Sequence, residues 1–216
     1  MIREIIWVAI SIFLLIVIIG TALQYSALHD LTYMSMLARV LFYLVMISII
    51  FFVVKKVENQ KLESIGLHTN DIVMQLITGI GIFAILSILP IGALLFGAEQ
   101  HILNSKLPNI ITLIYYTVFD ILFVGFGEEL VFRGFFLERI KKVLNSSIWA
   151  VLISSLLFGL WHYPTTQSIP LVIMATLIGV FFSLCKLRIR KCTIISLAVA
   201  HGLNDAFLLW LSFFLL

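Results

Sequence analysis

Long apolar runs separated by short polar breaks follow one another from end to end of the chain. Most runs are close to the ~20 residues that a helix needs to cross a ~30 Å hydrocarbon core. The pattern predicts seven membrane-spanning helices, at residues 4–23, 34–54, 72–96, 110–138, 148–162, 169–186 and 193–215. We therefore expect an all-α, polytopic transmembrane helix bundle, whose short fifth span is tilted or is met by water at its far end.

The polar breaks differ in their content of lysine and arginine. Basic residues gather at Arg3, in the longest break (55–71), after residue 138, and between residues 186 and 191. The intervening breaks 24–33 and 163–168 have none, and 97–109 has only Lys106. Because cytoplasmic loops of membrane proteins are enriched in lysine and arginine, this alternation predicts a cytosolic N-terminus and an external C-terminus in a cell membrane. The break at 55–71 is predicted to form a short helix on the surface.

The composition excludes several other classes of protein. The 216 residues are 62% hydrophobic and 12% charged, and the mean hydropathy is +1.17. A soluble domain of this size leaves roughly a third of its unfolded surface exposed, so it could not hide this much apolar area. The net charge of +3 is too small to indicate a nucleic-acid partner. The lipid bilayer is the partner that the composition implies.

Two local features were weighed against more specific interpretations. The first apolar run is longer than the core of a signal peptide and ends in a poor cleavage site, so we interpret it as a retained helix. The two cysteines, Cys185 and Cys192, flank a basic break and do not form a C-x-x-C pair. Two thiols alone cannot make a structural zinc site, and we expect free thiols.

Polar side chains that fall inside the predicted spans form three groups. They are Glu128, Glu129 and Arg133 in the fourth span; His162 at the end of the fifth; and His201, Asn204 and Asp205 in the seventh. Ionisable groups at such depth are costly unless they are paired or hydrated, and they usually face the interior of a bundle. At 1.5 Å per residue, Glu128 and His201 both lie roughly 15 Å from the basic ends of their helices. We therefore expect one site built from the last four helices.

Helix geometry separates the two glutamates. Glu129 and Arg133 are four residues apart on one helix face, where they can form an ion pair. Glu128 points about 100° away from Glu129 and stays free to act as a general base. His201 and Asp205 also share a face, from which they could donate hydrogen bonds to a developing oxyanion. Glycines flank all three groups and would let the helices approach closely.

Each group also has a purely structural interpretation. A Glu–Arg pair can be a structural staple, a histidine beside Trp161 and Tyr163 can be an interfacial anchor, and His201 with Asn204 can join helices by hydrogen bonds. The occurrence of all three groups on consecutive helices, at compatible depth, favours a single functional site over three unrelated structural features.

The same residues carry a resemblance to a known family. EELVFR fits the motif E-E-x-x-x-R, FGLWH fits F-x-x-x-H, and HGLND fits H-x-x-x-[N/D]. In these motifs the chain resembles the CPBP family of intramembrane endopeptidases (CAAX proteases and bacteriocin-processing enzymes, also called the Abi family) over about residues 110–210. The resemblance implies a catalytic core at 110–216, preceded by N-terminal helices and a polar surface segment at 1–109.

The resemblance also implies a role for each residue of the three groups. Glu128 and His162 would activate the attacking water, and His201 and Asp205 would stabilise the oxyanion. Glu129 and Arg133 would support the helix and tune the site. The best-understood relatives have asparagine where this chain has Asp205, so Asp205 either donates a hydrogen bond as a protonated acid or holds His201 in place. Whether Asn204 or Asp205 faces the site is left open.

Two further questions stay open at this point. Glu128, His162 and His201 could ligate a divalent metal such as zinc, or the site could use no metal, because the spacing is not H-E-x-x-H. The implied reaction is hydrolysis of a peptide bond in a membrane-anchored protein or peptide, of the CAAX type or of the leader and bacteriocin type. The alternatives are a non-catalytic immunity or scaffolding protein that binds a peptide, and a proton-linked carrier, which the absence of an inverted repeat makes the weakest.

Overall fold

The computed structural model describes residues 2–25, 33–97 and 107–215, and, of these, it leaves out the side chains of 16–25, 33 and 34. Most of the expected breaks at 24–33 and 97–109, including Lys106, therefore lie outside the described residues. All regular elements of the described residues are helical. They are α1 (Ile2–Tyr25), α2 (Tyr33–Phe52), η2 (Val53–Val57), η3 (Leu62–Ile65), α3 (Ile72–Leu86), α4 (Ile88–Leu95), α5 (Ile110–Phe119), η5 (Asp120–Val124), α6 (Gly125–Glu129), η6 (Leu130–Phe136), α7 (Leu137–Leu144), α8 (Ser147–Thr166), α9 (Ile169–Arg188) and α10 (Ile194–Leu215).

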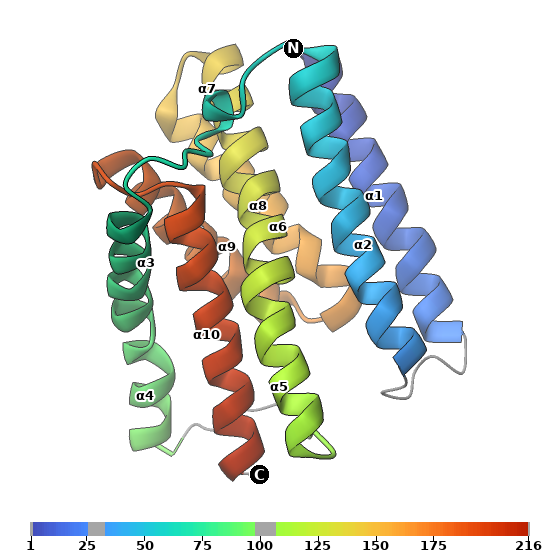
Figure 1. Ribbon diagram of the computed structural model, residues 1–216, viewed down its shortest axis with the longest axis vertical. Helices are drawn as coiled ribbons and strands as arrows, with labels where there is room; N and C mark the ends of the chain where they lie inside the picture. The colour runs from blue at the N-terminus through green and yellow to red at the C-terminus, as the bar shows by residue number, and fades with distance from the viewer. Residues whose placement is uncertain (1, 26–32, 98–106, 216) are drawn as a thin grey trace.

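These helices form the predicted transmembrane bundle (Figure 1). Six helical stretches of the described residues are long and apolar enough to cross a membrane, and α1, with 24 residues, has the length of a seventh. The helices run alternately up and down, so that α1 begins and α10 ends at opposite ends of the bundle. The fold class predicted from the sequence is confirmed.

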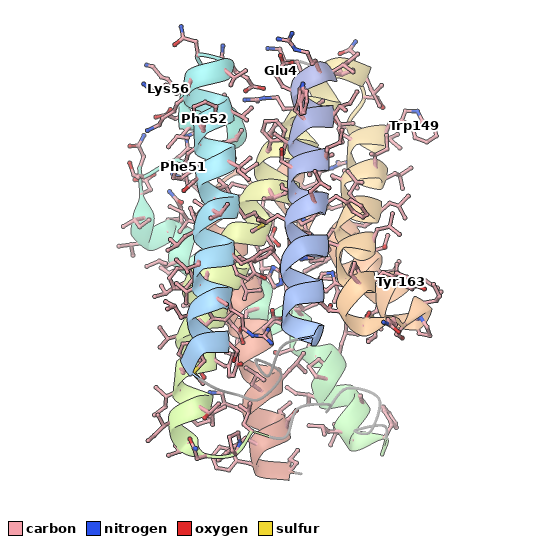
Figure 2. All side chains as sticks on the ribbon, turned by 90° about the vertical axis from the view of Figure 1, so that its right-hand side faces the viewer. Glu4, Phe51, Phe52, Lys56, Trp149 and Tyr163 are labelled. Carbon is pink, nitrogen blue, oxygen red and sulfur yellow. The ribbon has the colours of Figure 1, made fainter. Side chains whose placement is uncertain are left out.

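Apolar side chains cover the outside of the bundle. Figure 2 shows them along α1, α2 and α8, with Trp149 and Tyr163 toward the two ends of α8. Phe52 and Trp7 are each 61% exposed, which would be unusual on a soluble protein and suits contact with lipid. The predicted surface segment at 55–71 contains one short 3-10 helix, η3, which lies at the end of the bundle where α1 begins.

The fourth span is longer and less regular than the sequence predicts. It runs as one continuous helical stretch from Ile110 to Leu144, but two π-helical segments, η5 and η6, interrupt its α-helical hydrogen bonding. The five-residue α6, which carries both glutamates, lies between them. Such π-helical segments are rare and often occur at functional sites, because the widened turn re-aims the side chains around it.

α10 lies against α3 on one side and against η5 and α6 on the other. Close contact is possible because Gly125 and Gly202 lie where the backbones meet: a Cβ atom on Gly202 would be 2.5 Å from Cα of Ile121. The turn between α8 and α9 lies partway along the bundle, whereas α4, α5 and α10 extend further toward the end where α10 finishes (Figures 1 and 2). Side chains near the end of α8 therefore lie beside the middle of α10.

Candidate active site

Three helices bring Glu128, His162 and His201 together inside the bundle. Oε2 of Glu128 (α6) lies 4.0 Å from Nε2 of His162 (α8) and 3.9 Å from Nε2 of His201 (α10). Both distances are too long for direct hydrogen bonds. Oε2 of Glu128 is buried and has no hydrogen-bond partner among the described residues. The three groups expected from separate helices thus face one small space.

The other carboxylate oxygen of Glu128 is held by two donors that the sequence analysis did not identify. The hydroxyl of Tyr43 donates to Oε1 at 2.7 Å, and the indole Nε1–H of Trp161 donates to it at 3.0 Å. Tyr43 lies on α2, so the site also receives a group from the N-terminal half. A tyrosine in an apolar span could have indicated such a contact from the sequence, because a buried hydroxyl needs a hydrogen-bond partner.

His162 is oriented by the first residue of its own motif. Its Nδ1 lies 2.8 Å from the carbonyl oxygen of Phe158. A carbonyl can only accept, so Nδ1 carries a proton in this hydrogen bond, and in the neutral imidazole Nε2 is left as an acceptor facing Glu128. The imidazole also packs against the ring of Phe158 at 4.8 Å between centroids.

Glu129 is the centre of a buried ionic group. Its Oε1 accepts from Nη1 of Arg133 at 2.9 Å and lies 2.8 Å from Nδ1 of His201. Both Glu129 and Arg133 are completely buried, and the guanidinium lies over the ring of Phe158, 3.9 Å from its centroid. The geometry matches the expected pair within the helix. It adds His201 as a second partner, and this contact fixes the imidazole.

Asp205, rather than Asn204, faces the histidine. Oδ2 of Asp205 lies 3.3 Å from Nε2 of His201, one turn earlier on α10. Asn204 is buried and its Nδ2 lies 3.4 Å from Oδ1 of Asp205. Asp120, at the start of η5, is also buried, and it is close enough to Asp205, His201 and Glu128 for electrostatic interaction. The imidazole of His201 is therefore surrounded by carboxylates on α6, η5 and α10.

The donor set does not have the geometry of a metal centre. Within the described ranges, no group of three or more His, Cys, Asp or Glu side chains is arranged to hold a metal ion. Glu128 uses one oxygen for two hydrogen bonds, and Nε2 of His201 also faces Asp205.

The two cysteines do not offer a nucleophile. Both are free thiols and both are buried. In the turn between α9 and α10, burial raises the pKa of the Cys192 thiol to about 12. Because the thiolate is the reactive form, Cys192 is almost fully protonated near neutral pH, and a cysteine-protease mechanism has no support.

The chain was compared with known protein families, curated proteins and solved structures. Neither the curated proteins nor the solved structures contain a match to the chain. A family model described as Type II CAAX prenyl endopeptidase Rce1-like matches residues 110–207. This region carries Glu128, His162 and His201 and ends just beyond Asp205. The resemblance in the sequence motifs is thereby confirmed: residues 110–207, just under half of the chain, match the model of the Type II CAAX prenyl endopeptidase Rce1-like family.

Proposed function

We propose that the protein hydrolyses a peptide bond in a membrane-associated protein or peptide, with a water molecule activated by Glu128 and His162. One observation carries this proposal. Oε2 of Glu128 is buried without a hydrogen-bond partner among the described residues and faces two imidazole nitrogens at about 4 Å. Polar atoms at this separation are suited to hydrogen bonding through a shared water.

In the first step, the water lies between Glu128 and His162. It donates one hydrogen bond to Oε2 of Glu128 and the other to Nε2 of His162, whose Nδ1–H donates to the carbonyl of Phe158. Glu128 takes the first proton as the water oxygen attacks the carbonyl carbon of the substrate. The same carboxyl group then delivers that proton to the leaving amine as the C–N bond breaks.

His201 stabilises the negative charge that develops on the carbonyl oxygen of the substrate. Glu129 on one side and Asp205 on the other contact the two ring nitrogens and hold the imidazole in one orientation. A hydrogen-bond donor fixed in a site of low dielectric is the kind of preorganised group that lowers the barrier of acyl transfer. Of the two roles left open for Asp205, its contact with His201 favours the positioning role.

The family match and the membrane-spanning fold support a peptide held at the membrane as the substrate. The matching family is described as a CAAX prenyl endopeptidase, so a peptide held at the bilayer by a lipid anchor is one candidate. A leader or bacteriocin-type peptide is the other. In both cases the substrate reaches a site that lies within the bundle.

The experiment compares membrane-associated peptides of cells that carry the native chain or Glu128→Gln. The amide keeps the shape of the side chain but cannot accept the proton, so we expect uncut substrate to accumulate and cleavage to fall by at least about 10³-fold. Glu63→Gln, an exposed change in the polar segment, is the matched control and should behave as native. Retained cleavage by Glu128→Gln, with both variants inserted in the membrane, would overturn the mechanism.

Removal of metal ions tests separately whether the hydrolysis depends on a metal ion. With the accumulated peptide as substrate, we expect the purified protein to keep its activity after dialysis against EDTA or 1,10-phenanthroline. The reason is that the donors at the site do not converge as a metal set. Loss of activity with the chelator and its recovery with added zinc would show that a metal ion takes part.

A further inference from the structure

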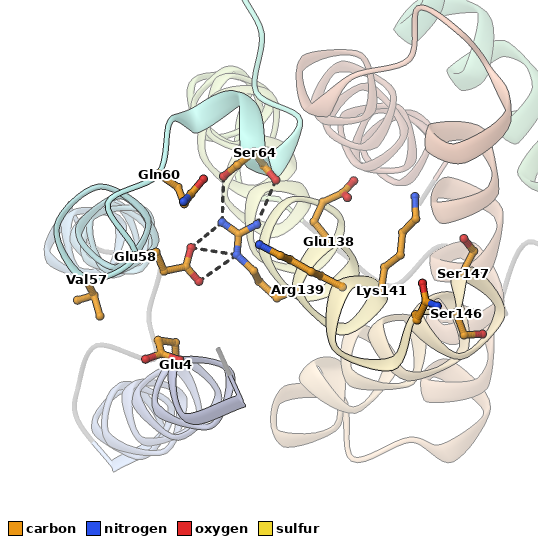
Figure 3. A pocket seen from close by; sticks show the side chains of 12 residues that line it. Glu4, Val57, Glu58, Gln60, Ser64, Glu138, Arg139, Lys141, Ser146 and Ser147 are labelled. Atoms are coloured by element: carbon orange, nitrogen blue, oxygen red, sulfur yellow. Dashed lines mark hydrogen bonds and ion pairs between the residues drawn. The ribbon is translucent and has the colours of Figure 1, made fainter.

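A cavity with a mainly polar lining lies away from the proposed active site, at the end of the bundle where α1 begins. Its volume is about 660 Å³, and it lies among the start of α1, the segment after η2, α7 and the first residues of α8. Figure 3 shows Glu4 and Glu58 on one side of it and Lys141 with Ser147 on the other. None of these residues belongs to the proposed catalytic group.

Each acidic side chain that lines this cavity has a cationic partner. Glu58 accepts from Nε and Nη2 of Arg139, at 2.9 and 2.6 Å, and the same guanidinium also bonds to the carbonyl and hydroxyl oxygens of Ser64 (Figure 3). Glu138 accepts from Nζ of Lys186 at 2.7 Å. Glu4 interacts with Arg3 at 3.6 Å.

Two cations in the lining have no such partner. Within the part of the chain that the structure describes, Lys141 and Lys142 have no ion pair and no hydrogen bond from the ammonium group. Lys141 is also close enough to Lys186 for like-charge repulsion. Since Arg139 and Lys186 are each matched by an acid, the charge left over in the cavity is positive. Asn145 and Ser147 add an amide and a hydroxyl that can donate to an anion.

The position of the cavity indicates where such an anion comes from. It opens at the end of the bundle that carries the basic breaks, so it lies at the depth of lipid headgroups rather than of acyl chains. Basic residues at this level attract anionic lipids. The cavity is also large enough for a phosphate with its attached glycerol, because ligand cavities of ~300–1,000 Å³ hold molecules of drug size.

We propose that this cavity binds a phosphate group, supplied by the headgroup of an anionic phospholipid, through Lys141, Lys142 and the donors of Asn145 and Ser147. A headgroup held there touches α1, the segment around Glu58 and the start of α8 at once. Bound lipid therefore links the N-terminal helices to the core that carries the active site. This proposal does not depend on the proposed peptidase activity.

The test measures thermal unfolding of the purified full-length chain in nanodiscs of phosphatidylcholine alone or mixed with phosphatidylglycerol. We expect the anionic mixture to raise the Tm of the native chain by about 4–8 °C. The double variant K141Q/K142Q should lose most of this shift while keeping the native Tm in phosphatidylcholine. The double variant R188Q/R190Q removes the same charge from exposed positions at the same end, outside the cavity, and should keep the shift.

Equal shifts in the two double variants would show that the anionic surface acts through overall charge, and would overturn the cavity as a site. Absence of a Tm shift in the native chain with phosphatidylglycerol would also overturn the cavity as a site. A further arm adds inorganic phosphate to the protein in phosphatidylcholine nanodiscs. Protection by phosphate that depends on Lys141 and Lys142 would support the phosphate site with a soluble source, and protection by phosphatidylglycerol alone would support the lipid.

Discussion

Glu128 and Glu129 are neighbours in the chain, but the structure places the two carboxylates in different surroundings. Glu129 is completely buried and is balanced by Arg133 and by His201. Glu128 has only neutral donors on one oxygen, from Tyr43 and Trp161, and its other oxygen has no hydrogen-bond partner among the described residues. A carboxylate held in this way leaves one oxygen in a fixed position to accept a proton, which is the geometry that a general base requires.

The division between the two glutamates could be predicted from the sequence, because an i, i+4 pair depends only on helix geometry. The donors to Glu128 could not. Tyr43 is 85 residues away along the chain, and nothing in the periodicity of α2 indicates which helix it packs against. The choice between Asn204 and Asp205 also needed the structure, since both are on one turn and their environment decides which one faces His201.

Tyr43→Phe tests the orientation of Glu128. Loss of one hydrogen bond to a charged group costs roughly 1.5–3 kcal/mol, so we expect kcat to fall about 10–100-fold. KM should change little, because the hydroxyl contacts the enzyme carboxylate and not the substrate. Tyr116→Phe, a half-buried tyrosine whose hydroxyl has no hydrogen bond to the described residues, is the control. Equal losses in the two variants, measured by steady-state cleavage, would contradict a positioning role.

At the scale of elements, the site depends on how closely α10 approaches η5 and α6. Hydropathy predicted both helices and placed their polar residues at compatible depths, and the glycines near each motif indicated close packing. The π-helical segments on either side of α6 were not predictable, because a widened turn has no hydropathy pattern of its own. Within η6, the carbonyl oxygen of Arg133 accepts a hydrogen bond from Nζ of Lys186 at 2.6 Å.

Gly202→Ala tests the close approach of these helices. An added Cβ atom would lie 2.5 Å from Cα of Ile121 and 2.7 Å from the carbonyl oxygen of Asp120, both of them backbone atoms that cannot rotate away. We expect α10 to shift, with destabilisation of about 1–3 kcal/mol and loss of most activity, because His201 precedes Gly202 directly. Thermal unfolding and cleavage assays would measure the two effects.

Gly81→Ala is the matched control for that change. Gly81 lies inside α3, and no atom is within 4 Å of the position of its added Cβ. Alanine in a helix interior is favoured over glycine by roughly 0.5–1 kcal/mol, so this variant should be as stable as the native chain or slightly more stable. If Gly202→Ala behaved like Gly81→Ala, the close contact would not be what positions His201.

For the whole molecule, charge is segregated along the membrane normal. Apart from Arg39 and Arg133 within spans and Lys106 in a break outside the described residues, every lysine and arginine belongs to breaks or helix ends on the side where α1 begins. The alternation of up and down helices in the bundle agrees with this arrangement. Hydropathy and charge bias are properties of whole segments, which is why the global architecture could be predicted from the sequence better than individual contacts.

The orientation of the bundle in the membrane is the prediction that follows from this segregation. Because cytoplasmic loops carry the excess of lysine and arginine, we expect the start of α1 and the segment 55–71 to face the cytosol and the end of α10 to face outside. A green fluorescent protein fused before residue 1 should fluoresce, and alkaline phosphatase fused after residue 216 should be active. Fusions within 55–71 should give the cytosolic response. Activity of alkaline phosphatase fused within 55–71 would show the opposite orientation. The proposed phosphate-binding cavity would then lie on the outer face instead of the cytosolic one.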